Sequence, residues 1–364
     1  MKIIKANIIT ENGLTEAHLS YSDKIEKIEL KSSPNPALPK LVSGFIDLHV
    51  HGGGGADIME AGSSAETISQ THAHFGTTSF LATTMTAPFS DLEKSFLALK
   101  ESFQNKKKNH ARILGVHLEG PFISADKLGA QPNFTREATL KEINHLNSIV
   151  PIKVITLAPE VFNHLDLIPE LKKIGITVQI GHTNGTYEQG VTALNQGAKS
   201  FTHLFNAMSS FHHRAPGMAG AALAHAEYAE LIPDLEHVHP GAIKVALKAI
   251  PNLYFVTDST AATGMPDGDY KLGSHTVHKC LGGVRLADGT LAGSALTMDQ
   301  AYRNLLSIGL TEAQITKKLS AIPAEVININ NRGQIKVGHF ADFVLLDKEN
   351  RISAVIIEGD ECDF

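Results

Sequence analysis

Cysteine is scarce in this chain of 364 residues, where only Cys280 and Cys362 occur. Two cysteines cannot form the disulfide framework on which small secreted domains depend. This usage is typical of a protein from a reducing compartment. The N-terminal segment also lacks the apolar core of a signal peptide, because Lys2 and Lys5 interrupt it. We therefore expect a cytoplasmic protein.

A basic excess and long apolar runs are also missing. The formal net charge is −6, with 32 lysines and arginines against 38 acidic residues. A nucleic-acid partner would demand a positively charged face, so we expect none. No apolar stretch is long enough to cross a bilayer, and we expect no membrane partner. Hydrophobic residues make up 43% of the chain, an ordinary globular composition.

The two ends of the chain share a pattern of short strands separated by polar turns. Neither end has enough strands to bury a face alone, so we expect residues 1–43 and 330–364 to form one small β-sandwich domain. The expected strands are Ile3–Ile9, Lys24–Leu30, Gly333–Val337, Asp342–Asp347 and Ser353–Glu358.

The middle of the chain, residues 44–329, alternates apolar or β-branched runs with amphipathic helical stretches. Eight such runs predict a (β/α)8 barrel of the TIM type, an α/β fold. The alternative, a doubly wound sheet, would place a Gly-x-Gly-x-x-Gly turn after its first strand. Gly52–Gly55 follow the first run without that spacing. The expected barrel strands are Leu41–His51, Thr77–Met85, Arg112–Glu119, Lys153–Pro159, Thr177–Thr183, Ser200–Phe205, Glu230–Pro233 and Leu253–Asp258.

Histidine is abundant, with 19 in the chain, and its placement suggests a metal site. His49 and His51 are two residues apart at the end of the first barrel run, so their side chains share a face. That end is the active-site face of such barrels. Taken alone, the pair could equally line a polar rim.

Other metal-ligating side chains recur at the ends of further strands. Glu119 ends the third run, His182 the fifth and Asp258 the eighth, and His203 lies in the sixth. Imidazole and carboxylate together suit Zn, Fe, Mn or Co. Several buried ionisable groups without a metal would be costly. We therefore predict one or two divalent metal ions bound by His49, His51, Glu119, His182, His203 and Asp258.

At these segments the chain resembles the amidohydrolase superfamily, and within it the N-acetylglucosamine-6-phosphate deacetylases. The resemblance spans nearly the whole chain and is most specific in Gly44–Gly52, His117–Phe122, Thr202–Met208, Val256–Asp258 and Leu291–Ser294. It implies hydrolysis of N-acetylglucosamine 6-phosphate to glucosamine 6-phosphate and acetate. It further implies that Glu119, His182 and His203 hold the main metal, and that His49 and His51 hold a second.

The resemblance also supplies substrate contacts. It implies that Asn206, Ala207, Arg214 and His237 touch the substrate, and that Arg214 reaches across from the neighbouring subunit of a homodimer. Some members carry a histidine that polarises the substrate carbonyl, and here Gln131 occupies the matching place. His117 shares a face with Glu119 and is expected to support the ligands from behind.

Asp258 is the expected general base and acid. A metal-activated water attacks the amide carbonyl, and the departing nitrogen needs a proton because an amide anion leaves poorly. Asp258 can take the proton from water and pass it to the amine. The other interpretation of Asp258 is a metal ligand without a proton-transfer role.

Three other functions remain open at this point. One is a different activity of the same superfamily, such as cyclic-amide hydrolysis or deamination, against which Glu119 as a ligand and Arg214 argue. N-acetylgalactosamine 6-phosphate requires the same metals and phosphate contacts, so its deacetylation is the nearest alternative. A non-catalytic barrel acting as a scaffold is the alternative from another class. Such a scaffold would have lost metal ligands, and none is missing from this chain.

Overall fold

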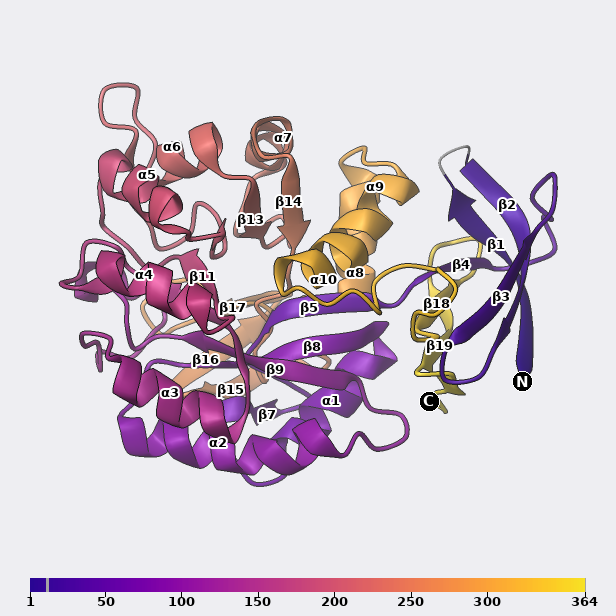
Figure 1. Cartoon of the computed structure of the whole chain (residues 1–364), viewed down its shortest axis with the longest axis horizontal. Helices are drawn as coiled ribbons and strands as arrows, with labels where there is room; N and C mark the ends of the chain where they lie inside the picture. Colours follow the sequence, from indigo (N-terminus) through magenta and orange to yellow (C-terminus); the bar gives the residue numbers. More distant parts are fainter. Residues whose placement is uncertain (11–12, 364) are drawn as a thin grey trace.

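The computed structural model describes residues 1–10 and 13–363. The chain forms a barrel of parallel strands surrounded by helices, with a smaller sheet beside it that holds both termini (Figure 1). Within the described residues, no helix is both long and apolar enough to span a bilayer.

The barrel strands lie in a six-stranded parallel sheet, ordered β12-β11-β10-β9-β8-β5, and a parallel pair, β13-β14. The backbone amide of Leu204 donates to Glu230 O at 2.8 Å, joining the two groups on one side. On the other side, the amide of Asp258 donates to His49 O at 3.0 Å. These bonds close the ring, and the predicted barrel is confirmed. The described strands are β5 (Phe45–Val50), β8 (Thr77–Thr84), β9 (Arg112–Glu119), β10 (Ile152–Leu157), β11 (Thr177–Ile180), β12 (Ser200–Phe201), β13 (Tyr228–Leu231) and β14 (Asn252–Phe255).

One helix follows each barrel strand and buries one face against it. In α3, for example, Ile143 and Leu146 face the core, and the Thr139 side chain accepts from the amide of Glu142 to cap the helix. Two further short helices, α9 (Glu312–Thr316) and α10 (Ile322–Val326), follow the helix of the eighth barrel strand. The eight helices are α1 (Ser64–His74), α2 (Phe89–Gln104), α3 (Leu140–Ile149), α4 (His164–Lys173), α5 (Tyr187–Gln196), α6 (Gly217–His225), α7 (Pro240–Ala249) and α8 (Met298–Ser307).

The sheet at the termini has the order β20-β19-β18-β4-β1-β2-β3, so both ends of the chain contribute to it. Tyr21 belongs to β2 and Phe343 to β18, and the strands β4 and β1 lie between these two in the sheet. Their rings nevertheless meet edge to face, with centroids 5.5 Å apart. The sheet therefore folds over on itself around its own apolar core. Its strands are β1 (Lys2–Thr10), β2 (Gly13–Tyr21), β3 (Ile25–Leu30), β4 (Lys40–Ser43), β18 (Phe343–Leu346), β19 (Ile352–Ile357) and β20 (Asp360–Glu361).

The single run predicted over Leu41–His51 divides at Gly44. The part before Gly44 is β4 of the terminal sheet, and the part after it is β5 of the barrel. A Cβ on Gly44 would lie 2.2 Å from Thr78 Oγ1, so only glycine permits this close approach between β5 and β8.

The strand predicted over Gly333–Val337 is wrong, because that segment is irregular. Gly333 has a φ of +79° and lies against Ser320 O, which breaks the extended backbone. The patterns above also did not identify the antiparallel sheet that follows the barrel's last strand, β15 (Gly268–Leu272), β16 (His275–Cys280) and β17 (Gly283–Arg285).

Candidate active site

The six side chains expected to bind metal lie together at the carboxyl ends of the barrel strands. Each is buried, with at most 8% of its surface exposed. They come from the end of β5, the end of β9, and the turns just after β11, β12 and β14. They are His49, His51, Glu119, His182, His203 and Asp258.

Glu119, His182 and His203 form one group of potential ligands. Glu119 Oε1 lies 3.2 Å from His182 Nε2 and 3.1 Å from His203 Nε2. The two imidazole nitrogens are themselves 3.0 Å apart. Three ligand atoms thus surround one small volume.

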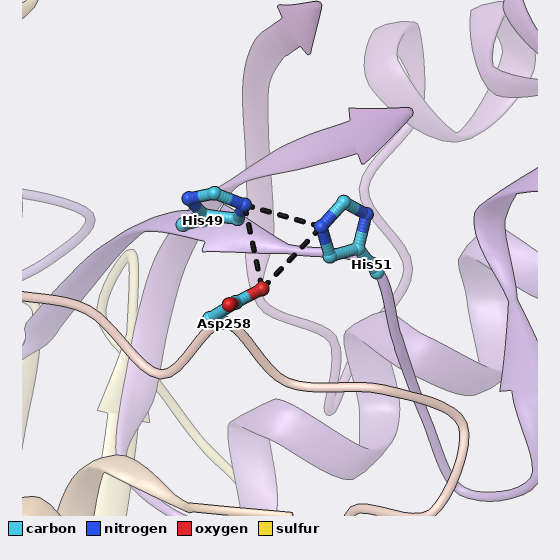
Figure 2. A group of neighbouring side chains, drawn as sticks. All are labelled: His49, His51 and Asp258. Carbon is cyan, nitrogen blue, oxygen red and sulfur yellow. Dashed lines mark hydrogen bonds and ion pairs between the residues drawn. The ribbon is translucent and has the colours of Figure 1, made fainter. Parts of the chain in front are cut away.

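His49, His51 and Asp258 form a second group beside the first. Figure 2 shows the two imidazoles and the carboxylate facing one another. The two Nε2 atoms are 3.1 Å apart, and each lies 3.4 Å from Asp258 Oδ1. Glu119 Oε2 lies 3.1 Å from His51 Nε2. Glu119 therefore contacts both groups, as a carboxylate shared by two ions would.

The chemistry of these donors fits a divalent metal. His51 Nδ1 lies 3.2 Å from Thr83 O, and His182 Nδ1 lies 2.8 Å from Lys127 O. A carbonyl oxygen only accepts, so both Nδ1 atoms carry a proton and both Nε2 atoms can present a lone pair to the centre. Lone pairs that face one another at 3.0–3.1 Å repel unless a metal ion or a proton lies among them, so the site either binds a metal or holds protons on these nitrogens.

Electrostatics at the site favours positive charge. Burial lowers the pKa of a histidine, but the carboxylates of Asp258 and Glu119 outweigh it and raise the pKa of His51 to about 9. Burial raises the pKa of an aspartate, but His49 and His51 outweigh it and lower the pKa of Asp258 to about 2. His49 in the same way holds the pKa of Glu119 well below its usual range despite burial. The carboxylates remain ionised at neutral pH and attract a cation.

A cavity of about 230 Å³ opens over these ligands. Four of the residues expected to bind substrate line it: Gln131, Asn206, Ala207 and His237. Leu272 of β15 also lines it, so the antiparallel sheet missed by the sequence patterns covers part of the pocket.

Gln131 is held rigidly between the ligands and a neighbouring turn. Its Nε2 donates to Glu119 Oε2 at 2.6 Å, and its Oε1 accepts from the amide of Thr86 at 2.7 Å. These two bonds fix which end of the amide faces the metal ligands. An amide N–H is thereby available at the edge of the pocket.

His237 is anchored in the same pocket wall. Its Nδ1 lies 2.6 Å from Asp234 Oδ2, and its backbone amide donates to Asp234 Oδ1 at 2.9 Å. The ring is thus oriented by its Nδ1 proton, which leaves Nε2 for another partner.

Arg214 lies apart from the pocket of its own chain. It is exposed on the turn between β12 and α6, and its Nη1 lies 2.7 Å from His213 Nε2. The neighbouring Phe211 is also exposed, at 59%. The structure of one chain therefore does not bring Arg214 to the other candidate substrate contacts.

Sequence reasoning missed Glu230 of β13, which is fully buried against the ligands. Its Oε1 lies 2.7 Å from His49 Nδ1. The available signal was an acid among the apolar residues Ala229, Leu231 and Ile232. His117 lies behind the ligands as expected, its ring centroid 4.6 Å from that of His49.

The model of the amidohydrolase family matches residues 41–362. The chain belongs to this family. Similar curated proteins include the N-acetylglucosamine-6-phosphate deacetylase of Lysinibacillus sphaericus, 39% identical over 88% of this chain and 84% of that protein. The N-acetylgalactosamine-6-phosphate deacetylase of Escherichia coli O157:H7 is 34% identical over 98% of both chains.

Solved structures in the family share the complete fold. The N-acetylglucosamine-6-phosphate deacetylase of Thermotoga maritima is 32% identical, with a TM-score of 0.91 and 99% of both chains covered. That of Mycobacterium smegmatis, solved as a mutant with N-acetyl-D-glucosamine-6-phosphate, is 30% identical with a TM-score of 0.91 over 99% of this chain and 98% of that one. The amidohydrolase fold thus extends over the whole chain.

Proposed function

We propose that this amidohydrolase hydrolyses N-acetylglucosamine 6-phosphate to glucosamine 6-phosphate and acetate, a step of amino-sugar metabolism. The observation that carries the proposal is the pocket itself. Two groups of buried metal-ligating side chains form its floor, in a chain 39% identical to a deacetylase of this specificity. An amide needs an activated water and a proton donor for its leaving nitrogen, and the pocket offers groups for both.

A divalent metal would be held mainly by Glu119, His182 and His203, and a second by His49 and His51, with Glu119 and Asp258 shared. The mixture of imidazole and carboxylate suits Zn, Fe, Mn or Co. Such a metal lowers the pKa of water towards about 7 and so makes hydroxide available at neutral pH.

Asp258 would act as general base and then as general acid. Its depressed pKa leaves it ionised at neutral pH, ready to accept a proton. Its position on the cavity wall lets it deliver that proton to the amide nitrogen as the C–N bond breaks. Gln131 would donate its free N–H to the substrate carbonyl, where negative charge develops.

Phosphate recognition would fall to Asn206, Ala207 and His237, together with Arg214 from a neighbouring subunit. The first three line the cavity. Arg214 is exposed and outside that lining, which is consistent with a role in a partner's pocket. A homodimer with composite active sites would explain both placements.

The remaining assignments stay proposals of the same kind. We assign residues 1–43 and 330–364 to a small β domain and residues 44–329 to the catalytic barrel, since strands from both ends share one sheet. We place the enzyme in the cytoplasm on the grounds of its cysteine content.

The second candidate substrate is N-acetylgalactosamine 6-phosphate. It is favoured by the 34% identity to a deacetylase of that epimer over 98% of the chain. A product assay with both sugar phosphates, run beside elemental analysis of the purified protein, decides between them. The proposal fails if neither substrate releases acetate when the protein carries its full complement of metal.

A further inference from the structure

Glu230 links the two groups of metal ligands through one carboxylate oxygen. Its Oε1 lies 2.7 Å from His49 Nδ1 and accepts from the backbone amide of His203 at 3.0 Å. Its Oε2 accepts from the Tyr254 hydroxyl at 3.3 Å. Glu230 is 0% exposed, so bulk solvent does not screen its charge.

In the described part of the chain, no lysine or arginine pairs with Glu230 to balance its charge. Among the described residues, its one ion-pair partner is His49. Glu119 and Asp258 likewise pair with histidines alone. A buried carboxylate is costly without compensating charge. A cation bound at the opposite nitrogen of His49 would supply that charge to Glu230 through the ring.

Glu230 could instead be a metal ligand itself, since His49, His117 and Glu230 offer atoms within 4.8 Å of one another. The hydrogen bonds of His117 argue against this. Its Nδ1 lies 3.1 Å from Leu48 O, and its Nε2 lies 2.8 Å from Thr156 Oγ1. Both ring nitrogens are engaged, and neither is left to bind an ion.

We propose that Glu230 is a positioning residue for the metal centre. It keeps the proton of His49 on Nδ1, aims Nε2 at Asp258, and makes the imidazole a stronger donor to the metal. Through the His203 amide it also fixes the turn that presents a ligand of the other group. This inference rests on the proposed metal-dependent function, because it concerns how the ligands of that metal are held.

Cobalt binding tests the proposal without relying on turnover. Metal-free wild type, Glu230→Gln and Tyr254→Phe are titrated with Co²⁺ against a competing chelator, and the visible absorption of the bound cobalt is recorded. The Gln variant keeps the shape of the side chain but removes its charge. We expect it to bind Co²⁺ about 10–100-fold more weakly, the usual effect of losing such a supporting carboxylate, with an altered spectrum. Tyr254→Phe removes only a long, neutral hydrogen bond at the other oxygen, so its affinity should stay within about threefold of wild type.

A second comparison separates positioning from general damage. In a His49→Gln background, Glu230→Gln should cost little further affinity, because the ring through which it acts is gone. If Glu230→Gln does not fold, Glu230→Asp keeps the charge but withdraws it from His49, and the same weakening is expected.

Unchanged affinity and spectrum in Glu230→Gln would overturn the inference, as would an equal loss in Tyr254→Phe or a full further loss in the His49→Gln background. Failure of the wild type to bind Co²⁺ would instead contradict the proposed function. The two failures are therefore distinguishable.

Discussion

Arg214→Ala offers a direct test of the composite active site. Arg214 is exposed, and within the described part of the chain its side chain forms one hydrogen bond, with His213. Its removal should therefore change the free energy of unfolding by no more than about 0.5 kcal/mol. If its guanidinium binds the substrate phosphate, the lost charge-assisted bond is worth about 1.5–3 kcal/mol. That corresponds to a rise of roughly 10- to 150-fold in KM.

The assay has a kinetic part and a mixing part. KM is first compared for the phosphorylated and unphosphorylated acetylamino sugar, since only the former gives the guanidinium a phosphate to bind. Arg214→Ala and Asp258→Asn chains are then co-expressed with different affinity tags, and the mixed dimers are isolated. In a mixed dimer, the Arg214→Ala chain keeps its own Asp258 and receives Arg214 from its partner. That pocket should work, while the other carries both defects.

Isolated mixed dimers should thus regain about half of the wild-type activity, and an unsorted one-to-one mixture about a quarter, since half of its dimers are mixed. No recovery in dimers verified by both tags would refute the shared site. An equal loss for the unphosphorylated sugar would refute the phosphate contact.

Three further predictions address the metal, the proton and the fold. Removal of metal by a chelator should abolish deacetylation, and addition of Zn²⁺, Fe²⁺, Co²⁺ or Mn²⁺ should restore it; full activity of the metal-free protein would contradict this. The His182→Ala variant should lose its activity, and elemental analysis should show that it has also lost metal. Asp258→Asn should lower kcat by roughly 10²–10⁴-fold with little change in KM at saturating metal, and a loss of only a few-fold would leave Asp258 without a proton-transfer role. Burial lowers the pKa of His72 to about 4, below its value of about 6.5 in an unfolded chain. As pH falls from 6.5 towards 4, the unfolded chain therefore binds a proton at His72 that the folded chain does not, and the free energy of unfolding should drop by up to ~3 kcal/mol because of this residue. Burial also lowers the pKa of His117, so urea unfolding should show a pH slope in both metal-free proteins that is steeper in wild type than in His72→Gln; equal slopes would contradict the prediction.

The barrel could be predicted because its strands are buried on both faces. The predicted runs Thr77–Met85 and Arg112–Glu119 match the observed strands β8 and β9 to within a residue. The strands β11, β12 and β14 are shorter than their apolar runs indicated, and β13 begins two residues before its run. β12 ends at Phe201 and β14 at Phe255, because the chain leaves the extended conformation before His203 and Asp258. Apolar residues continue past the point at which the backbone ceases to be extended, so the sequence pattern did not reveal where these strands end.

The candidate ligands could be predicted because imidazole and carboxylate recur at equivalent strand ends. Glu230 could not be found that way, since a single acid in a short strand usually faces solvent. Its burial depends on how β13 meets His49 of β5, a contact between segments 181 residues apart. Arg214, in contrast, was named from the sequence, but the structure of one chain does not test its contact because its expected partner belongs to another chain.

The backbone at the site explains how these ligands converge. His182, His203 and Asp258 all have positive φ, at 47°, 28° and 51°. A residue other than glycine is destabilised by about 1–2 kcal/mol in this left-handed region of backbone conformation. Three such residues at one site therefore need stabilising contacts from their surroundings. His182 O accepts from the amide of Ser124 at 2.9 Å, and Asp258 O accepts from that of Ser294 at 2.7 Å. The fold thus stabilises sharp turns where the ligands leave their strands, and it sets their geometry before any metal binds.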